Sequence, residues 1–181
     1  MKCPTCSKED LQPAEIEKGL IGAGCQNCHG VLISLIQYRY WLDHFQPSDD
    51  QIITEQGNNL AIDSKGAKLC PKCSKLMTKF KIDASSENRI ELCGHCDEAW
   101  LDGGEWQLLK QLDMQDHLPE LFTDAWQKKI RAERQHAHWQ KHYTELLGED
   151  AFAKVDAFKQ WLDQHPKSSE IKHYLTTNFD V

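Results

Sequence analysis

Hydrophobic and polar residues follow two different patterns along this chain of 181 residues. In the first part, apolar residues form short runs in which they alternate with polar ones, most clearly between Leu76 and Ile82. A period of two predicts half-buried strands. From Pro119 onward, apolar residues recur every three or four positions, which is the period of amphipathic helices. The pattern therefore predicts a first part built on strands and a helical last third.

The first part contains an internal repeat, and each copy predicts one β-hairpin. The turns fall at Lys18-Gly19 in the first copy and over residues 84–88 in the second. Pro13 marks the first strand as an edge or irregular strand, because proline cannot donate to a sheet ladder. The predicted strands span residues 11–16 and 20–24 in the first copy and residues 76–82 and 89–92 in the second.

A helix-start signal follows each hairpin, after a short apolar segment. In the first copy, Ser34 is followed three positions later by Gln37. In the second copy, Asp102 is followed in the same way by Glu105. Both pairs fit the capping box, in which the first side chain caps the helix and the second bonds back to the first backbone N–H. The short helices expected from these signals span residues 35–45 and 103–112.

The last third predicts two antiparallel helices and a shorter third one. A long helix is expected from Pro119, which suits a first helical position, to a glycine cap at Gly148. A second helix is expected over residues 150–164 and a third over residues 169–176. The turn at Gly148-Glu149 would join the two longer helices into an α-helical hairpin.

Eight cysteines in four CxxC pairs add chemistry to this picture. All of them lie in the first part, and about 18 or 19 residues separate the two pairs within each copy. Four thiolates in tetrahedral array satisfy zinc, and two CxxC turns are a simple way to bring four sulfurs together. We therefore expect two structural Zn²⁺ ions, one per copy. Their ligands would be Cys3, Cys6, Cys25 and Cys28 at the first site and Cys70, Cys73, Cys93 and Cys96 at the second.

Other uses of the cysteines are weighed against structural zinc. Iron in a rubredoxin-like site takes the same ligands, so the residues alone leave iron open. A redox CxxC needs a strand-to-helix context, and catalytic zinc needs an open coordination position, which four cysteines per site close. Disulfides are disfavoured in a reducing compartment. His29 and His95 lie beside the ligands and are expected outside the first coordination shell or exposed.

Together these patterns predict a small metal-bound α+β protein. Two tandem zinc ribbons, each with a short capped helix, would be followed by an α-helical hairpin. The expected divisions are a first ribbon with its helix over residues 1–46, a linker over 47–69, a second ribbon with its helix over 70–118, and a C-terminal helical region over 119–181.

The segment from Cys93 to Glu105 reads CGHCDEAWLDGGE. It resembles the bacterial zinc-ribbon family named for its likeness to transcription factor IIB, with Glu98 in place of the usual glycine. The first copy keeps the ligands and Gly30 but lacks the Trp and Asp, so it looks like a degenerate version. The resemblance covers residues 1–112 and implies a zinc-ribbon fold with no established catalytic activity. Its link to nucleic acid is an analogy at the level of the fold.

The formal net charge of −7 argues against a general affinity for phosphate backbones. One basic stretch stands out within the long helix, where aromatic residues and histidines are interleaved with cations. A solvated helix face whose aromatic residues pack on the second helix is the preferred interpretation. The candidate nucleic-acid contacts in this stretch are Lys128, Arg131, Arg134 and Lys141.

No nucleophile paired with a base and no phosphate-binding loop is evident in the sequence, so we expect a protein that is not an enzyme. Six tryptophans, several on short helices that have little core to cover them and are expected to expose them, favour an adaptor that recognises another protein. A transcriptional regulator that binds nucleic acid through the basic helix is the alternative, and metal storage or sensing is a third. The absence of a signal-like start or a membrane-length apolar run predicts a cytoplasmic protein without a membrane partner.

Overall fold

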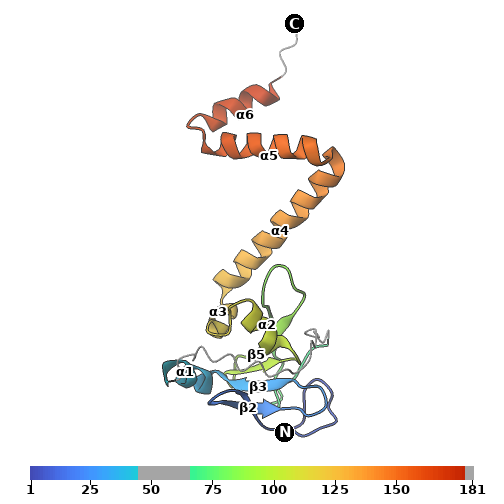
Figure 1. Cartoon of the computed structure of the whole chain (residues 1–181), viewed down its shortest axis with the longest axis vertical. Coiled ribbons are helices and arrows are strands. Elements are labelled where there is room, and N and C mark those ends of the chain that lie inside the picture. The colour runs from blue at the N-terminus through green and yellow to red at the C-terminus, as the bar shows by residue number, and fades with distance from the viewer. Residues whose placement is uncertain (45–65, 178–181) are drawn as a thin grey trace. The chain divides into compact units, whose positions relative to one another are not determined.

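The computed structural model describes residues 1–44 and 66–177 (Figure 1). The chain divides into two compact units, Met1–Ala132 and Glu133–Val181. The first unit therefore holds both cysteine repeats, and the boundaries expected at residues 46, 70 and 118 do not separate compact units. Of the predicted linker over 47–69, residues 47–65 lie outside the described residues.

The first unit is built on one antiparallel sheet of six strands, in the order β1-β2-β3-β6-β5-β4 (Figure 1). Both predicted hairpins are confirmed. The edge position predicted from Pro13 is also confirmed, because β1 lies at one edge and carries a bulge between Glu15 and Glu17. The strands are β1 (Gln12–Glu17), β2 (Leu20–Gly24), β3 (Val31–Ser34), β4 (Thr78–Lys81), β5 (Arg89–Cys93) and β6 (Glu98–Leu101).

The two copies of the repeat join through β3 and β6, the last strand of each copy. These strands pair antiparallel, with Leu32 opposite Trp100 and Ile33 opposite Ala99. The first copy supplies β1 to β3 and the second supplies β4 to β6. From either edge of the sheet, the first, second and third strands of one copy follow in that order. Each ribbon thereby covers the open edge of the other, and the two form a single sheet with no separate ribbon domains.

One face of the sheet packs against three short helices, α1 (Leu35–His44), α2 (Glu105–Gln111) and α3 (Leu118–Leu121). Trp41 of α1 and Trp106 of α2 meet there in an edge-to-face contact with ring centroids 6.3 Å apart. Both are buried, as is Trp100. The expectation that tryptophans on the short helices are exposed for a partner is therefore wrong. The shared sheet gives these side chains a core that one ribbon alone would lack.

The predicted capping box of the second copy forms in one direction only. The backbone N–H of Asp102 donates to Glu105 Oε2 at 2.8 Å. Gly104, with φ 88°, stands at the N-cap of α2 without a side-chain capping bond, so Asp102 is not the N-cap residue. The Asp102 carboxylate instead makes hydrogen bonds with Thr5, Lys68 and Trp100.

Three further helices follow: α4 (Asp124–Leu147), α5 (Glu149–Gln164) and α6 (Ser168–Thr176). The long helix begins later than predicted, because Pro119 lies in the separate helix α3 and Thr123 Oγ1 accepts a hydrogen bond from the N–H of Trp126 near the start of α4. Within the second unit, α5 packs against α6. The predicted hairpin packing of α4 on α5 is not observed, and Trp139 and Phe158 are 47% and 43% exposed.

None of the helices in the described stretches has the length and apolarity needed to cross a lipid bilayer.

Candidate metal centres

The four CxxC turns share one backbone geometry. In each turn the residue after the second cysteine has a positive φ, between 54° and 59°. Its N–H donates to the carbonyl of the first cysteine at 2.8 to 3.0 Å. This closed turn holds the two sulfurs of a pair on the same side of the backbone. The four residues at the positive-φ position are Ser7, His29, Ser74 and Asp97.

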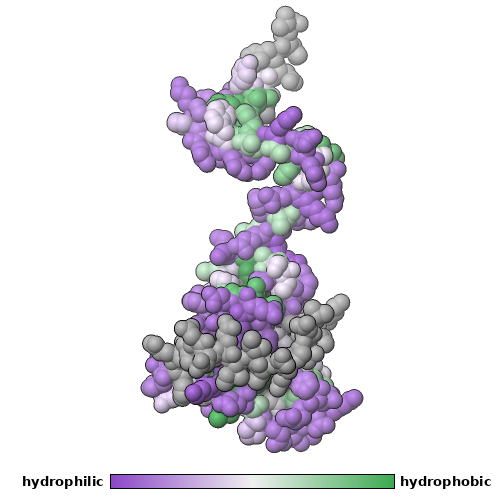
Figure 2. All heavy atoms as spheres, in the orientation of Figure 1, coloured by the Kyte–Doolittle hydropathy of each residue, from purple (hydrophilic) through white to green (hydrophobic). Residues whose placement is uncertain are grey.

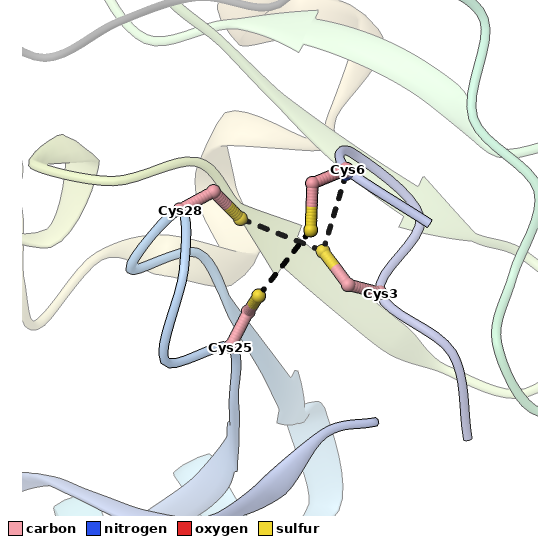
Figure 3. Close-up of side chains that lie close together, drawn as sticks. All are labelled: Cys3, Cys6, Cys25 and Cys28. Carbon is pink, nitrogen blue, oxygen red and sulfur yellow. Dashed lines mark hydrogen bonds between the residues drawn. The ribbon is translucent and has the colours of Figure 1, made fainter. Parts of the chain in front are cut away.

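The first group brings together the sulfurs of Cys3, Cys6, Cys25 and Cys28, all within 4.8 Å of one another (Figure 3). The sulfurs of Cys3 and Cys28 are 3.5 Å apart, and those of Cys6 and Cys25 are 3.6 Å apart. A zinc ion bound at about 2.3 Å to four sulfurs would set each pair roughly 3.8 Å apart. All four cysteines are free thiols, so the group can hold a metal ion.

The second group repeats this arrangement with Cys70, Cys73, Cys93 and Cys96. The sulfurs of Cys73 and Cys93 are 3.6 Å apart. In each group the first cysteine of every pair is buried and the second is half-buried. Four sulfurs complete a tetrahedral shell and leave no position for water or substrate, which is the arrangement of structural sites.

Both groups lie on the face of the sheet opposite the helices. Leu32 and Trp100 point to this face and form one cluster with the buried cysteines, while their neighbours Val31 and Leu101 point to the helical face. The alternation of side chains along β3 and β6 thus assigns one face to the core and the other to the metal centres.

Backbone hydrogen bonds and burial shift the pKa values of the thiols in opposite directions. Backbone hydrogen bonding from Lys8 lowers the pKa of Cys6 to about 6. Burial raises the pKa of Cys3, and it raises the pKa of Cys28 still further. Four thiolates this close together cannot all carry charge without a cation among them. A divalent metal ion supplies that charge, so binding would release protons.

The two neighbouring histidines are exposed. His29 and His95 both lie outside the four-cysteine groups. His95 Nδ1 lies 3.0 Å from Lys75 Nζ. Their exposure agrees with the prediction that these histidines lie outside the first coordination shell or are exposed.

A buried ionic network links the two repeats and was not predicted. Lys68 is 2% exposed, and its Nζ lies 2.5 Å from Glu91 Oε1 and 2.9 Å from Asp102 Oδ2. The other oxygen of Asp102 accepts hydrogen bonds from Thr5 Oγ1 at 2.8 Å and from Trp100 Nε1 at 2.9 Å. Thr5 lies inside the first CxxC turn, so this hydrogen bond joins Asp102 of the second copy to a cysteine turn of the first copy.

Sequence reasoning placed Lys68 in the linker and gave Asp102 a capping role. The order Trp-Leu-Asp after the last cysteine pair could have indicated this ionic network, because a carboxylate close to a buried tryptophan needs a partner. Glu98, which stands where the family pattern has glycine, is also buried and pairs with Lys72 of the third CxxC turn.

Close packing between the copies depends on two glycines. A Cβ added at Gly30 would lie 2.4 Å from Trp100 Cζ2. A Cβ added at Gly103 would lie 2.5 Å from the carbonyl oxygen of Cys28. Each glycine belongs to one copy and the atom it meets belongs to the other.

The candidate nucleic-acid residues all lie on α4. Lys128, Arg131 and Lys141 are exposed, and Arg134 is half-buried. Lys128 and Arg131 belong to the first compact unit, whereas Arg134 and Lys141 belong to the second. The described structure therefore does not assemble the four into one site within a single unit.

Comparison of the chain with protein-family models, with curated proteins and with solved structures gives no match. The resemblance of the segment from Cys93 to Glu105 to the ribbon family stays a prediction. The geometry itself gives two groups of four cysteines, each able to hold one metal ion.

Proposed function

We propose that this protein is a non-enzymatic zinc protein that works as a protein-interaction module. In this proposal each four-cysteine group holds one structural Zn²⁺ ion, and the sheet they stabilise is a scaffold for the helices. The observation that carries the structural role is the closed shell of four sulfurs in both groups. A small domain gains folding free energy from such sites, because they form only in the folded chain.

Zinc is favoured over iron because it is the commoner ion in four-cysteine ribbons. Elemental analysis of purified protein should give two zinc per chain. Iron would be recognised by its content and by visible absorption of the iron–thiolate bonds. A metal content of two iron per chain would overturn the assignment of zinc and leave the scaffold role standing.

A catalytic role is not supported by the surroundings of the metal groups. Neither shell has an open position. A groove of about 450 Å³ beside β1 and β2 is lined mostly by apolar residues such as Leu11, Pro13 and Ile21. The charged residues in its lining, Lys72 and Glu98, already form an ion pair with each other.

The interaction role is supported by apolar side chains exposed on the C-terminal helices. Trp139, Tyr143 and Leu146 of α4 are 47%, 42% and 66% exposed. On α5, Val155 and Trp161 are 52% and 50% exposed. Figure 2 shows apolar side chains gathered on the surface of the C-terminal helices. Large apolar side chains gathered on the surface are typical of protein–protein contact sites.

The interaction role is tested by comparing proteins captured by the wild-type chain with those captured by a Trp139→Ser/Trp161→Ser variant. Ile36→Ser is the matched control, since Ile36 is 67% exposed on α1 and lies outside the C-terminal helices. We expect partners to be retained by the control and lost by the double variant, with equal zinc content. Equal capture by both variants would contradict the role of these helices.

Nucleic-acid binding is the second candidate. It is supported by the exposure of Lys128, Arg131 and Lys141 on the helix that also exposes Trp139. The net charge of −7 weighs against it. If it is correct, charge reversal at Arg131 and Arg134 should abolish a salt-dependent shift of DNA or RNA in a binding assay.

A further inference from the structure

The second compact unit has almost no core of its own. Across its described part, Leu162 is the single buried apolar residue. A unit of about 50 residues rarely folds stably without a staple, a metal or a partner. Both groups that could hold a metal ion lie in the first unit, and no such group is found among the described residues of the second. The apolar side chains of the unit therefore need a covering surface.

Two apolar stripes run along the helices of this unit. On α4 the stripe is Trp139, Tyr143 and Leu146, with steps of four and three residues. On α5 it is Val155, Phe158 and Leu162, with steps of three and four. Alternating steps of three and four residues place the side chains along one face of each helix, which is typical of helices that pack side by side. Although α6 packs on α5, Val155 and Phe158 stay 52% and 43% exposed.

The exposed apolar surface is large enough for a stable pair of chains. Four aromatic and three aliphatic side chains on α4 and α5 are each about half exposed. An aromatic side chain buries roughly 200 Å² when it is fully covered. Because the seven side chains are already half covered and three of them are smaller, they would bury roughly 600 Å² more per chain. Two chains would then bury roughly 1,200 Å², the lower end of the range for specific interfaces before any polar rim is counted.

Charge disfavours one of the possible pairings. In the part of α4 that belongs to the second unit, Arg134 and Lys141 balance Glu133 and Glu145. α5 carries two lysines against four acidic residues, a net charge of −2. Packing α5 on α5 of another chain would bring like charges together, whereas packing α4 on α5 would not.

We propose that the second unit is a dimerisation module whose partner is a second copy of this chain. The inference rests on the proposed function, because it names the protein that the exposed helices bind. The stripe on α4 of one copy packs on the stripe on α5 of the other, and the reverse contact forms at the same time. Such a two-fold pair is self-complementary and closes on itself, which is the commonest symmetry of soluble oligomers.

The test is the molar mass of the metal-loaded full chain, measured by light scattering and sedimentation over a range of micromolar concentrations. The chain has a mass of 20.9 kDa, and we expect twice this value. Val155→Asp/Phe158→Asp should weaken the dimer by on the order of 30-fold or more, the effect of losing one hot spot. Trp139→Ser/Tyr143→Ser should do the same from the other stripe.

Ala153→Asp is the matched control. Ala153 is exposed on the same helix, two residues before Val155 and on a different side. It adds one charge without touching the stripe, so this variant should remain a dimer. Circular dichroism and zinc content show whether each variant is folded.

A wild-type chain of 20.9 kDa at every concentration would overturn the dimer. If that monomer still captured another protein through Trp139 and Trp161, the proposed interaction role would stand. If it captured nothing, both would fall. A Val155→Asp/Phe158→Asp variant as dimeric as its control would also overturn the assigned surface.

Discussion

Leu32 pairs with Trp100 across the ladder between β3 and β6, and the two residues are also equivalent positions of the repeat, 68 positions apart. A residue that pairs antiparallel with its own counterpart lies on a two-fold axis. The two ribbons within one chain therefore meet in the way that the subunits of a symmetric dimer meet. At the axis itself the two copies differ, because the tryptophan of one copy faces the smaller leucine of the other.

Gly30→Ala tests the closeness of that contact. The added Cβ would lie 2.4 Å from Trp100 Cζ2, and a large buried ring has little room to move. We expect a loss of about 1–3 kcal/mol, the usual cost of overpacking a core. The measurement is denaturant unfolding at fixed excess zinc, followed by tryptophan fluorescence.

Gly94→Ala is the control for this substitution. Gly94 lies in the fourth CxxC turn, and a Cβ added there meets nothing within 4 Å. Its stability should stay close to that of the wild-type protein. Equal losses in both variants would mean that the effect arises from the turns and that the contact with Trp100 plays no part.

Lys68→Met tests the ionic network between the copies. It would remove the cation that the buried carboxylates of Glu91 and Asp102 share, although Glu91 would keep its pair with Lys79, whose Nζ lies 3.2 Å from Glu91 Oε1. Breaking a buried pair by removing one partner costs about 3–5 kcal/mol. The same unfolding assay measures this loss. Lys2→Ala, which removes an exposed pair with Asp10, should change stability little, and a comparable loss there would argue against a special role for burial.

The parts of this structure that depend on local spacing could be predicted from the sequence. The four CxxC turns have one geometry because each is set by a few consecutive residues, and the predicted ligands meet in the two groups. Both hairpins follow from the alternation of apolar residues and from their turns. Pro13 gave the position of the edge strand in the same way.

The parts that depend on contacts between distant segments could not be predicted. Pairing of β3 with β6 gives Trp41 and Trp106 a shared core, and nothing in either copy alone indicates that pairing. Lys68 is read from the sequence as a solvated linker residue, since its partners lie 23 and 34 residues away. Helical spacing marked the apolar faces of α4 and α5 but did not identify what covers them.

The buried carboxyl group of Glu105 should make the free energy of unfolding fall as the pH rises. Its side chain is fully buried beside Asp102 and Glu91, and burial raises its pKa from a usual value near 4.5 to about 8. At neutral pH the folded protein therefore holds a proton here that the unfolded chain releases. Between these two values the unfolded chain binds fewer protons, so the free energy of unfolding falls as pH rises toward 8 and levels off above it.

Glu105→Gln mimics the protonated carboxyl and retains an oxygen for the N–H of Asp102. The variant should show a flatter pH dependence than the wild-type protein, measured from about pH 6.5 upward so that the thiolates keep their metal. Burial also raises the pKa of Glu91, so a residual slope of the same sign is expected. An unchanged slope in Glu105→Gln would show that Glu105 is not the titrating group.

Removal of the metal should unfold the first unit and leave much of the C-terminal helix content. The two four-cysteine groups hold together the turns that flank β2 and β5, and the strands between these turns also carry the core on the helical face, so both faces of the sheet depend on the turns being fixed. Excess chelator is expected to abolish the near-ultraviolet signal of Trp100 and its neighbours. The second unit contains no cysteine, so its helical signal at far-ultraviolet wavelengths should persist.

The contacts of Asp102 with Thr5 and Lys68 join the first CxxC turn to the second copy. We therefore expect metal binding at the two groups to be coupled. Cys6→Ser should prevent metal binding at the first group and also weaken metal binding at the second. Asp102→Asn should reduce this coupling, since its amide cannot pair with the Lys68 cation as a carboxylate does. Chelator competition measures the affinity of the remaining site in each variant. Unchanged affinity at the second group after loss of the first would show that the two centres fold independently, in spite of the sheet they share.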